Sequence, residues 1–258
     1  MSDQPVTYAV ADRVATITLN RPDAKNRLDL ESMGMMRELL ADAASDDAVR
    51  VVVLTGSGTT FCSGADLAGA VAATEGGFAA GGTTGLVGLL TDMLDHPKPI
   101  IARVQGHVAG GGNGLVAACD IAVASTEAKF AFSEVRVGVA PAIISVVCLQ
   151  VMHRRDAQEL LLTGERVTAE RVLHAGLVTA VVEADSLDAA VQGYADALLL
   201  AGPEAVANTK TLLRRVPAMP RDDAWAWTAE MSAGLFTSAE AREGMTAFLE
   251  KRKPQWAP

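Results

Sequence analysis

Three short segments built almost entirely of apolar residues constrain the fold of this chain most strongly. They are Val51–Leu54, Ile100–Val104 and Ile121–Ala124. Continuous apolarity, in place of an alternation with polar residues, indicates strands that are buried on both faces of a parallel sheet. Segments with the apolar spacing of a helix separate these runs, so the middle of the chain is predicted to repeat strand and helix. We therefore expect an α/β fold.

The segments before this region predict a hairpin and then a helix. Thr7–Val10 and Val14–Leu19 are rich in β-forming residues and are separated by a short turn. Asp29 is a suitable N-cap for the helix that should follow. The apolar residues of that helix would share one face: Leu30, Met33, Met36, Leu40 and Ala43. Thr74–Gly85 is rich in Gly, Thr and Ala and is predicted to be a mobile loop.

Helical segments predominate after Pro141. Helices are predicted at Pro141–His153, Asp156–Leu162, Thr168–Ala175, Ser186–Leu200, Pro203–Arg215 and within Asp222–Lys251, and one last short strand at Val178–Val182. We expect a core over residues 1–200 and a separate helical region over residues 201–258.

Charge and composition narrow the class of function. The net charge of −9 disfavours an extended surface for nucleic acid or for an anionic membrane. The longest apolar stretch, Val137–Leu149, is too short to span a bilayer, and the first residues lack the pattern of a signal peptide. Cys62, Cys119 and Cys148 have no metal-ligand spacing, and the histidines and carboxylates show none either. We expect a cytoplasmic protein with free thiols and no metal site.

Two glycine-containing segments follow predicted strands and are candidate ligand sites. In Phe61–Leu67, the small residues Gly64 and Ala65 would let a ligand approach the backbone, although a surface turn would also use glycine. Gly106–Gly114 holds three consecutive glycines where a helix should begin, which would leave free N–H groups beside the positive end of the helix dipole. Such groups can bind an oxyanion. A flexible linker or close helix packing are the alternatives, and the spacing does not match a dinucleotide fingerprint.

Glu134 is the third candidate, because it lies in the largely apolar segment Phe130–Gly138. A carboxylate that is partly buried there would have a raised pKa, as a general base requires. It could instead cap a helix, remain on the surface or pair with Arg136.

Together, and in this order, these segments resemble the crotonase superfamily, which contains the enoyl-CoA hydratase/isomerase family. The matching residues span nearly the whole chain: Asn20–Pro22 with Asn26 and Leu28, Phe61–Leu67, Gly106–Gly112 with Ala118–Asp120, Phe130–Gly138, Leu162–Glu165, Ala175–Val178 and Glu243–Arg252.

The resemblance implies a spiral of repeated ββα turns with a C-terminal helical region that builds trimers, often stacked as hexamers. It implies acyl-CoA thioester substrates from fatty-acid metabolism such as β-oxidation, or from related acyl-CoA metabolism. No separate cofactor is expected, because coenzyme A is part of the substrate. The expected partners are thus the acyl-CoA and further copies of the chain, in a homotrimer or a dimer of trimers.

The resemblance also implies residue roles. The catalytic residues would be Glu134, which transfers the proton, and Ala65 and Gly111, whose backbone amides would form an oxyanion hole. The expected substrate-binding residues are Ala65, Asp66, Leu67, Ala68, Gly110 and Gly111, with Phe248 and Lys251 reaching the adenine end from a neighbouring subunit.

One departure from the family pattern concerns Gly114. Hydratases of this family that use two glutamates carry the first of them at this position. A single glutamate could deliver OH and H in turn to one face of a double bond, or shuttle a proton between C2 and C4. We therefore expect an enoyl-CoA hydratase acting on a 2-trans-enoyl-CoA. The alternatives are a Δ3-Δ2-enoyl-CoA isomerase and a non-catalytic acyl-CoA-binding member of the fold.

Overall fold

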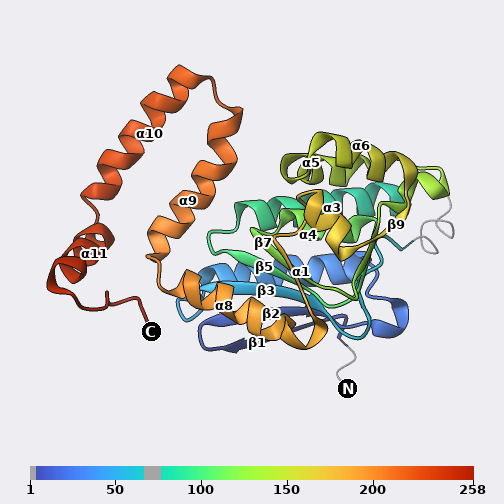
Figure 1. Ribbon diagram of the computed structural model, residues 1–258, viewed down its shortest axis with the longest axis horizontal. Helices are drawn as coiled ribbons and strands as arrows, with labels where there is room; N and C mark the ends of the chain where they lie inside the picture. Colours follow the sequence, from blue (N-terminus) through green and yellow to red (C-terminus); the bar gives the residue numbers. More distant parts are fainter. Residues whose placement is uncertain (1–3, 67–76) are drawn as a thin grey trace.

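The computed structural model describes residues 4–66 and 77–258 (Figure 1). Its larger sheet has the strand order β1-β2-β3-β5-β7-β10. The strands are β1 (Val6–Ala11), β2 (Val14–Leu19), β3 (Val51–Gly56), β5 (Ile100–Val104), β7 (Ile121–Ser125) and β10 (Ala180–Val182). The β1–β2 hairpin is antiparallel and the other neighbours are parallel, so the three apolar runs are confirmed as adjacent strands of a parallel sheet.

A second, smaller sheet has the order β4-β6-β8-β9. Its strands are β4 (Thr60–Cys62), β6 (His107–Ala109), β8 (Lys129–Ala131) and β9 (Arg166–Thr168). The first three are parallel to one another, and β9 is antiparallel to β8. Each of these three follows a strand of the larger sheet and precedes a helix: α3 (Gly77–Asp95), α4 (Gly111–Ala118) or α5 (Ala142–Val151). The predicted repetition of ββα turns is therefore confirmed.

Helix α1 (Leu30–Ser45) begins where the sequence predicts. The side chain of Asp29 accepts a hydrogen bond from the amide of Ser32, and the Ser32 hydroxyl accepts one from the amide of Asp29, which forms a capping box. The predicted apolar face is buried except for Leu30, the first residue of the helix, which is 52% exposed.

The loop predicted for Thr74–Gly85 is wrong over residues 77–85, which form the first half of α3. Residues 74–76 lie outside the described parts of the chain. Three glycines of α3 lie against α1, where Cβ atoms placed on them would come close to side chains: Gly81 to Leu30, Gly85 to Met33 and Gly88 to Arg37. The glycines therefore allow close packing of two helices, and this packing overrides their low helix propensity.

The larger sheet separates two apolar clusters. Val52 and Leu54 of β3 belong to the main core, whereas Val51 and Val53 pack with α8 (Leu187–Leu199). Helices α6 (Arg154–Thr163) and α7 (Ala169–His174) add to the main core. Strand β3 is buried along its whole length, as its continuous apolar sequence requires.

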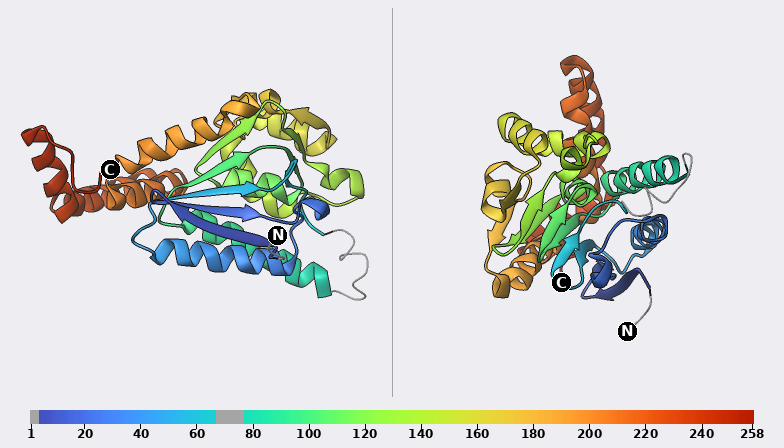
Figure 2. Two further views of the ribbon diagram at one scale, coloured as in Figure 1. Left: turned by 90° about the horizontal axis from the view of Figure 1, so that it is seen from below. Right: turned by 90° about the vertical axis from the view of Figure 1, so that its right-hand side faces the viewer.

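The last helices form an arm that extends away from the sheets (Figures 1 and 2). They are α9 (Pro203–Arg215), α10 (Arg221–Phe236) and α11 (Ala239–Glu250). An ion pair between Lys210 and Asp120, with N and O 2.7 Å apart, ties α9 to the core. The Arg13 guanidinium donates to the main-chain carbonyl of Trp256, which returns the end of the chain to the sheet. Throughout residues 4–66 and 77–258, no helix combines the length and apolarity needed to cross a bilayer.

Candidate active site

The three segments singled out by the sequence meet at one edge of the smaller sheet. Strand β4 leads into Gly64 and Ala65, β6 leads into Gly110 and Gly111, and β8 leads into Glu134. Because the three strands are parallel neighbours, their carboxyl ends lie side by side, and this edge is where α/β folds generally bind ligands.

The segment around Gly64 is fixed by backbone hydrogen bonds to the loop before α1. The amide of Leu28 donates to the carbonyl of Gly64 at 2.8 Å, and the amide of Asp66 donates to the carbonyl of Leu28 at 3.1 Å. The loop itself is anchored by Asn26, which is buried and donates from its side chain to the carbonyl of Thr60 at 2.7 Å. The Asn26 and Leu28 positions of the sequence motif thus hold the first loop of the site in place.

The loops that carry Gly64 and Gly110 are in van der Waals contact. Gly64 has φ +85, and a Cβ atom placed on it would lie 2.8 Å from the carbonyl oxygen of Ala109 and 3.0 Å from the amide nitrogen of Gly111. Gly110 has φ +51 and is the N-cap of α4. Both backbone conformations favour glycine, and the contact leaves no room for a side chain at Gly64.

Two backbone amides at this contact are free to bind a ligand. Gly111 is the first residue of α4, where an amide has no acceptor within the helix. Ala65 lies next to Gly64 and its amide faces away from the bridge to Leu28. Neither amide donates a hydrogen bond to any group within residues 4–66 and 77–258. Two unpaired donors beside each other can hold a developing oxyanion.

The carboxylate of Glu134 lies beside this pair of loops. It is carried by a short 3-10 helix, η2 (Ser133–Val137), and its Oε1 would be 3.7 Å from a Cβ atom placed on Gly110. Its Oε2 is buried without a hydrogen-bond partner among the residues that the structure describes. Burial raises the pKa of Glu134 above its ordinary value, against a smaller lowering by a hydrogen bond to its own backbone.

The surroundings of Glu134 exclude the ion pair with Arg136 that was considered for it. Arg136 donates from Nε to the carbonyl of Thr163, and no cation within the described ranges forms an ion pair with Glu134. A raised pKa and an unpaired buried oxygen both lower the stability of the folded protein. Groups that destabilise the fold in this way are typical of catalytic sites.

Glu134 and the two amides line one cavity of about 360 Å³. Its polar lining consists of this carboxylate and the hydroxyl-bearing residues Ser63, Thr83 and Ser133, and Glu134 is its only ionisable residue in the described structure. Most of the remaining wall is apolar: Leu86, Val137, Val139, Ala140, Pro141, Ala142, Ile143 and Ile144. A second, smaller cavity of about 120 Å³, lined by Leu28 and Met33 among others, shares Ala65, Thr83, Leu86 and Ile143 with the first.

The remaining predicted binding residues are distributed differently. Asp66 does not line the cavity and forms an ion pair with Arg27, with N and O 3.2 Å apart. Leu67 and Ala68 lie outside the described residues. Phe248, which is 82% exposed, and Lys251 lie at the end of α11, far from the cavity of their own chain (Figure 1).

Sequence reasoning missed the residues that shape the site from α4 and α5. Asn113 is fully buried and donates from its side chain to the carbonyls of Ala131, at 2.8 Å, and Gly110, at 3.3 Å. It therefore joins the loop before α4 to the strand that leads to Glu134. Ile143 and Ile144 form the apolar wall, and the sequence marked them only as part of a helix after Pro141.

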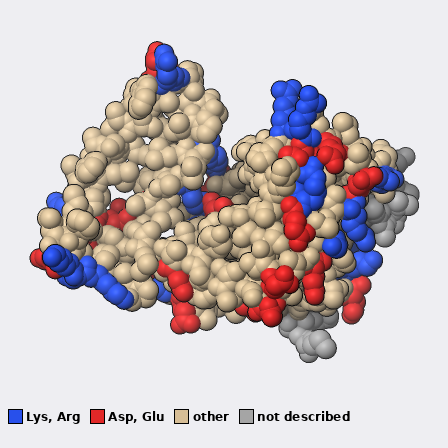
Figure 3. Space-filling model, in the orientation of Figure 1, with Lys and Arg blue, Asp and Glu red and all other residues tan. Residues whose placement is uncertain are grey.

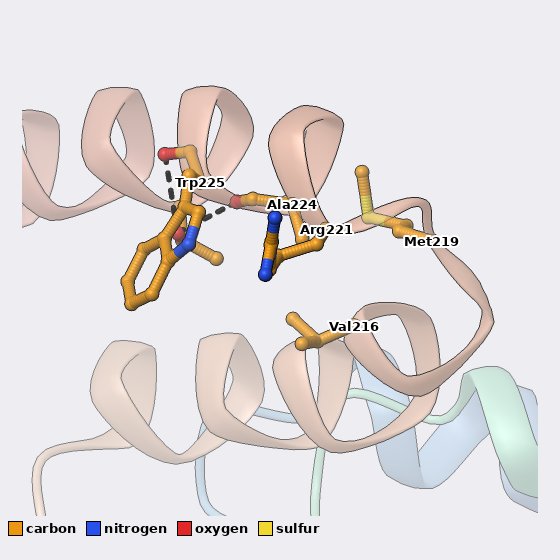
Figure 4. Close-up of a pocket in the computed structure, with 6 residues that line it drawn as sticks. Val216, Met219, Arg221, Ala224 and Trp225 are labelled. Atoms are coloured by element: carbon orange, nitrogen blue, oxygen red, sulfur yellow. Dashed lines mark hydrogen bonds between the residues drawn. The ribbon is translucent and has the colours of Figure 1, made fainter.

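A cavity of similar volume, about 380 Å³, lies in the C-terminal arm between α9 and α10 (Figure 4). It is lined by Val216, Met219, Arg221, Ala224, Trp225 and Thr228. It contains no carboxylate or histidine, so general acid–base chemistry has no candidate there. Across the described parts of the chain, no three His, Cys, Asp or Glu side chains cluster in a way that could hold a metal.

Fold and site together define a class of protein in which ββα repeats place two free amides beside one carboxylate. The sequence model of the enoyl-CoA hydratase/isomerase family matches residues 10–258. The chain is 36% identical over 255 residues to (E)-benzylidenesuccinyl-CoA hydratase of Thauera aromatica, and the alignment covers 97% of this chain and 98% of that protein. It is 34% identical over 251 residues to carnitinyl-CoA dehydratase of Citrobacter koseri, with 94% of each covered.

The fold is also similar to that of solved members of the family. The crystal structure of an enoyl-CoA hydratase from Mycobacterium smegmatis matches with a TM-score of 0.93 and 34% identity over 98% of each chain. The chain therefore belongs to the enoyl-CoA hydratase/isomerase family of the crotonase superfamily, whose members act on acyl-CoA thioesters.

Proposed function

We propose that this protein is an enoyl-CoA hydratase that adds water across the double bond of a 2-trans-enoyl-CoA. The observation that carries the proposal is the buried, unpaired Oε2 of Glu134 beside the free amides of Ala65 and Gly111. The names of the relatives from Thauera aromatica and Citrobacter koseri, a hydratase and a dehydratase, agree with it, because both describe water chemistry on a CoA thioester.

In the proposed mechanism the thioester oxygen accepts hydrogen bonds from the amides of Ala65 and Gly111. Attack of water at C3 moves an electron pair toward this oxygen, and the two amides stabilise the resulting enolate. Glu134 takes a proton from the water as the C3–O bond forms, and it returns that proton to C2 when the enolate collapses. The raised pKa of Glu134 suits a group that must first accept and then donate a proton. Both additions occur on the face of the substrate next to Glu134.

Double-bond isomerisation is the second candidate, and one observation favours it. Glu134 is the only ionisable residue lining the cavity among the described residues, and moving a proton between C2 and C4 needs only one acid–base group. A non-catalytic acyl-CoA-binding protein would gain nothing from a destabilising carboxylate at this position.

Self-association of the chain, as a homotrimer or a dimer of trimers, is part of the same proposal. The arm exposes large apolar side chains, including Trp225 at 69% and Phe248 at 82%, and exposed apolar patches are typical of interaction surfaces. On the face shown in Figure 3 the middle of the arm carries few charged residues. Phe248 and Lys251 would then reach the adenine end of a coenzyme A bound to a neighbouring copy, and Ala65 to Ala68 of that copy would border its pantetheine arm.

Two substrates offered separately to the purified protein distinguish the candidates. Hydration of a short 2-trans-enoyl-CoA removes the ultraviolet absorbance of the conjugated thioester, whereas isomerisation of a 3-enoyl-CoA creates it. We expect rapid hydration of the 2-trans-enoyl-CoA by the wild-type protein. The rate of this hydration should fall strongly in Glu134→Gln. Rapid turnover of the 3-enoyl-CoA with none of the 2-enoyl-CoA would replace the hydratase by the isomerase, and tight binding with no turnover of either would indicate a binding protein.

A further inference from the structure

Helix α4 begins at the active-site cavity, which Gly111 lines, and Gly114 lies further along the same helix against Ile144 of α5. The helix is buried along its whole length. A Cβ atom placed on Gly114 would lie 2.6 Å from Cγ2 and 3.2 Å from Cβ of Ile144, and 3.6 Å from Cδ1 of Leu90. Gly114 has an ordinary helical backbone, so the obstacle to a side chain is the space that Ile144 occupies.

Ile144 has little freedom to move out of this space. It is 2% exposed and lies within α5, and a β-branched side chain in a helix has one strongly preferred rotamer. The close contacts involve its Cβ and Cγ2, which are the atoms nearest the backbone. Relief of the contact would therefore require a shift of the helices, which are close-packed.

Ile144 also lines the cavity that contains Glu134 and the amide of Gly111. A side chain at position 114 would project toward Ile144, which is part of the cavity wall. The isoleucine thus presents alkyl groups on the α4–α5 side of the site, where an acidic side chain from α4 would otherwise enter.

We propose that Ile144 is a specificity-determining residue, because it fills the space of a side chain at position 114 and so restricts the site to chemistry with one carboxylate. This proposal rests on the proposed function for its catalytic consequence, since Glu134 must then hold the water as well as move the proton. Its structural part, the mutual exclusion of side chains at positions 114 and 144, is independent of the reaction.

A thermodynamic cycle tests the structural part. We expect Gly114→Ala to lower the Tm of the wild-type protein by several degrees, because the new methyl group meets Ile144. In an Ile144→Ala background the same substitution should raise Tm by about 2–4 °C, because alanine is the better helix former once the space is open. Gly34→Ala is the matched control, since no atom of the described residues, apart from the backbone of α1 itself, lies within 4 Å of a Cβ placed there. The control should raise Tm similarly in both backgrounds. An effect of Gly114→Ala with the same sign in both backgrounds would overturn the proposal.

Kinetics test the catalytic part. Gly114→Glu alone should fold poorly, whereas Gly114→Glu with Ile144→Ala should fold and hydrate a linear 2-trans-enoyl-CoA at least about tenfold faster than Ile144→Ala alone, because it gains a second acid–base group. A folded double variant with no gain in hydration would reject the catalytic role of Ile144. If the wild-type protein turns over no enoyl-CoA, the proposed function fails, and the Tm cycle still decides whether the two positions exclude each other.

Discussion

Replacing Gly64 by alanine should separate the stability of the fold from the geometry of the oxyanion site. The new methyl group would lie 2.8 Å from the carbonyl oxygen of Ala109 and 3.0 Å from the amide nitrogen of Gly111. These atoms belong to the loop that carries one of the two free amides, and Gly64 directly precedes the residue that carries the other. The substitution therefore pushes apart the two donors that must converge on one oxygen.

The magnitude follows from two contributions. A non-glycine residue at φ +85 costs about 1–2 kcal/mol, and the overlap with Ala109 adds about 1–3 kcal/mol. For a chain of this length the sum corresponds to a fall in Tm of roughly 5–20 °C. Displacing one donor of an oxyanion hole lowers kcat by about 10²–10³-fold.

Gly176→Ala provides a matched control, measured by the same melting and enoyl-CoA hydration assays. Gly176 has φ +84, and a Cβ atom there would lie 2.6 Å from the carbonyl oxygen of Val151, so its backbone strain and overlap resemble those of Gly64. It does not line the cavity. We expect a similar fall in Tm for both variants and a kcat near the wild-type value for Gly176→Ala alone. Equal losses of kcat in the two folded variants would refute the assignment of the oxyanion site.

Three further predictions concern Glu134 and Asn113. Glu134→Gln should lower kcat by about 10²–10⁴-fold, measured with the 2-enoyl-CoA, and should raise Tm at neutral pH, because it removes a buried charge. Since burial raises the pKa of Glu134 in the folded protein, its contribution to stability is present at low pH and is lost as pH rises through that pKa. The Tm advantage of the variant should therefore grow with pH, and a constant difference would contradict this. For the wild-type protein, kcat/KM should rise with pH around a pKa above the ordinary value for glutamate, and an acid limb at the ordinary value would argue against Glu134 as the base. Asn113→Ala removes the side-chain hydrogen bonds to the carbonyls of Gly110 and Ala131 and should lower stability by about 1–3 kcal/mol. It should also lower kcat by a larger factor than it raises KM. An unchanged kcat would limit Asn113 to a structural role.

The central strands were predictable because burial on both faces leaves a continuous apolar sequence. Strand β5 begins and ends at the predicted residues, and β3 and β7 each begin at the predicted residue and extend slightly beyond the predicted end. The start of α1 was predictable for a local reason, since Asp29 and Ser32 form its capping box within one turn. Helix α3 was not predictable, because its glycines are explained only by contacts with a helix distant in sequence.

The individual loops of the site could be identified from the sequence, but not the way in which they come together. The strands that align them, β4, β6 and β8, have three residues each, which is too short for a periodic pattern. The resemblance to a family supplied the association of Glu134 with the two amides. It carried no information on Ile144, whose role depends on the packing of α5 against α4.

The two apolar clusters on opposite faces of the larger sheet have a consequence for variation among related proteins. Val51 and Val53 support only the layer formed with α8, while the loops that bind and react are built on the other layer. Changes in side-chain volume beneath α8 can thus adjust melting temperature while the reacting groups keep their spacing. Adaptation to temperature and adaptation to a new acyl chain can then proceed through different sets of residues.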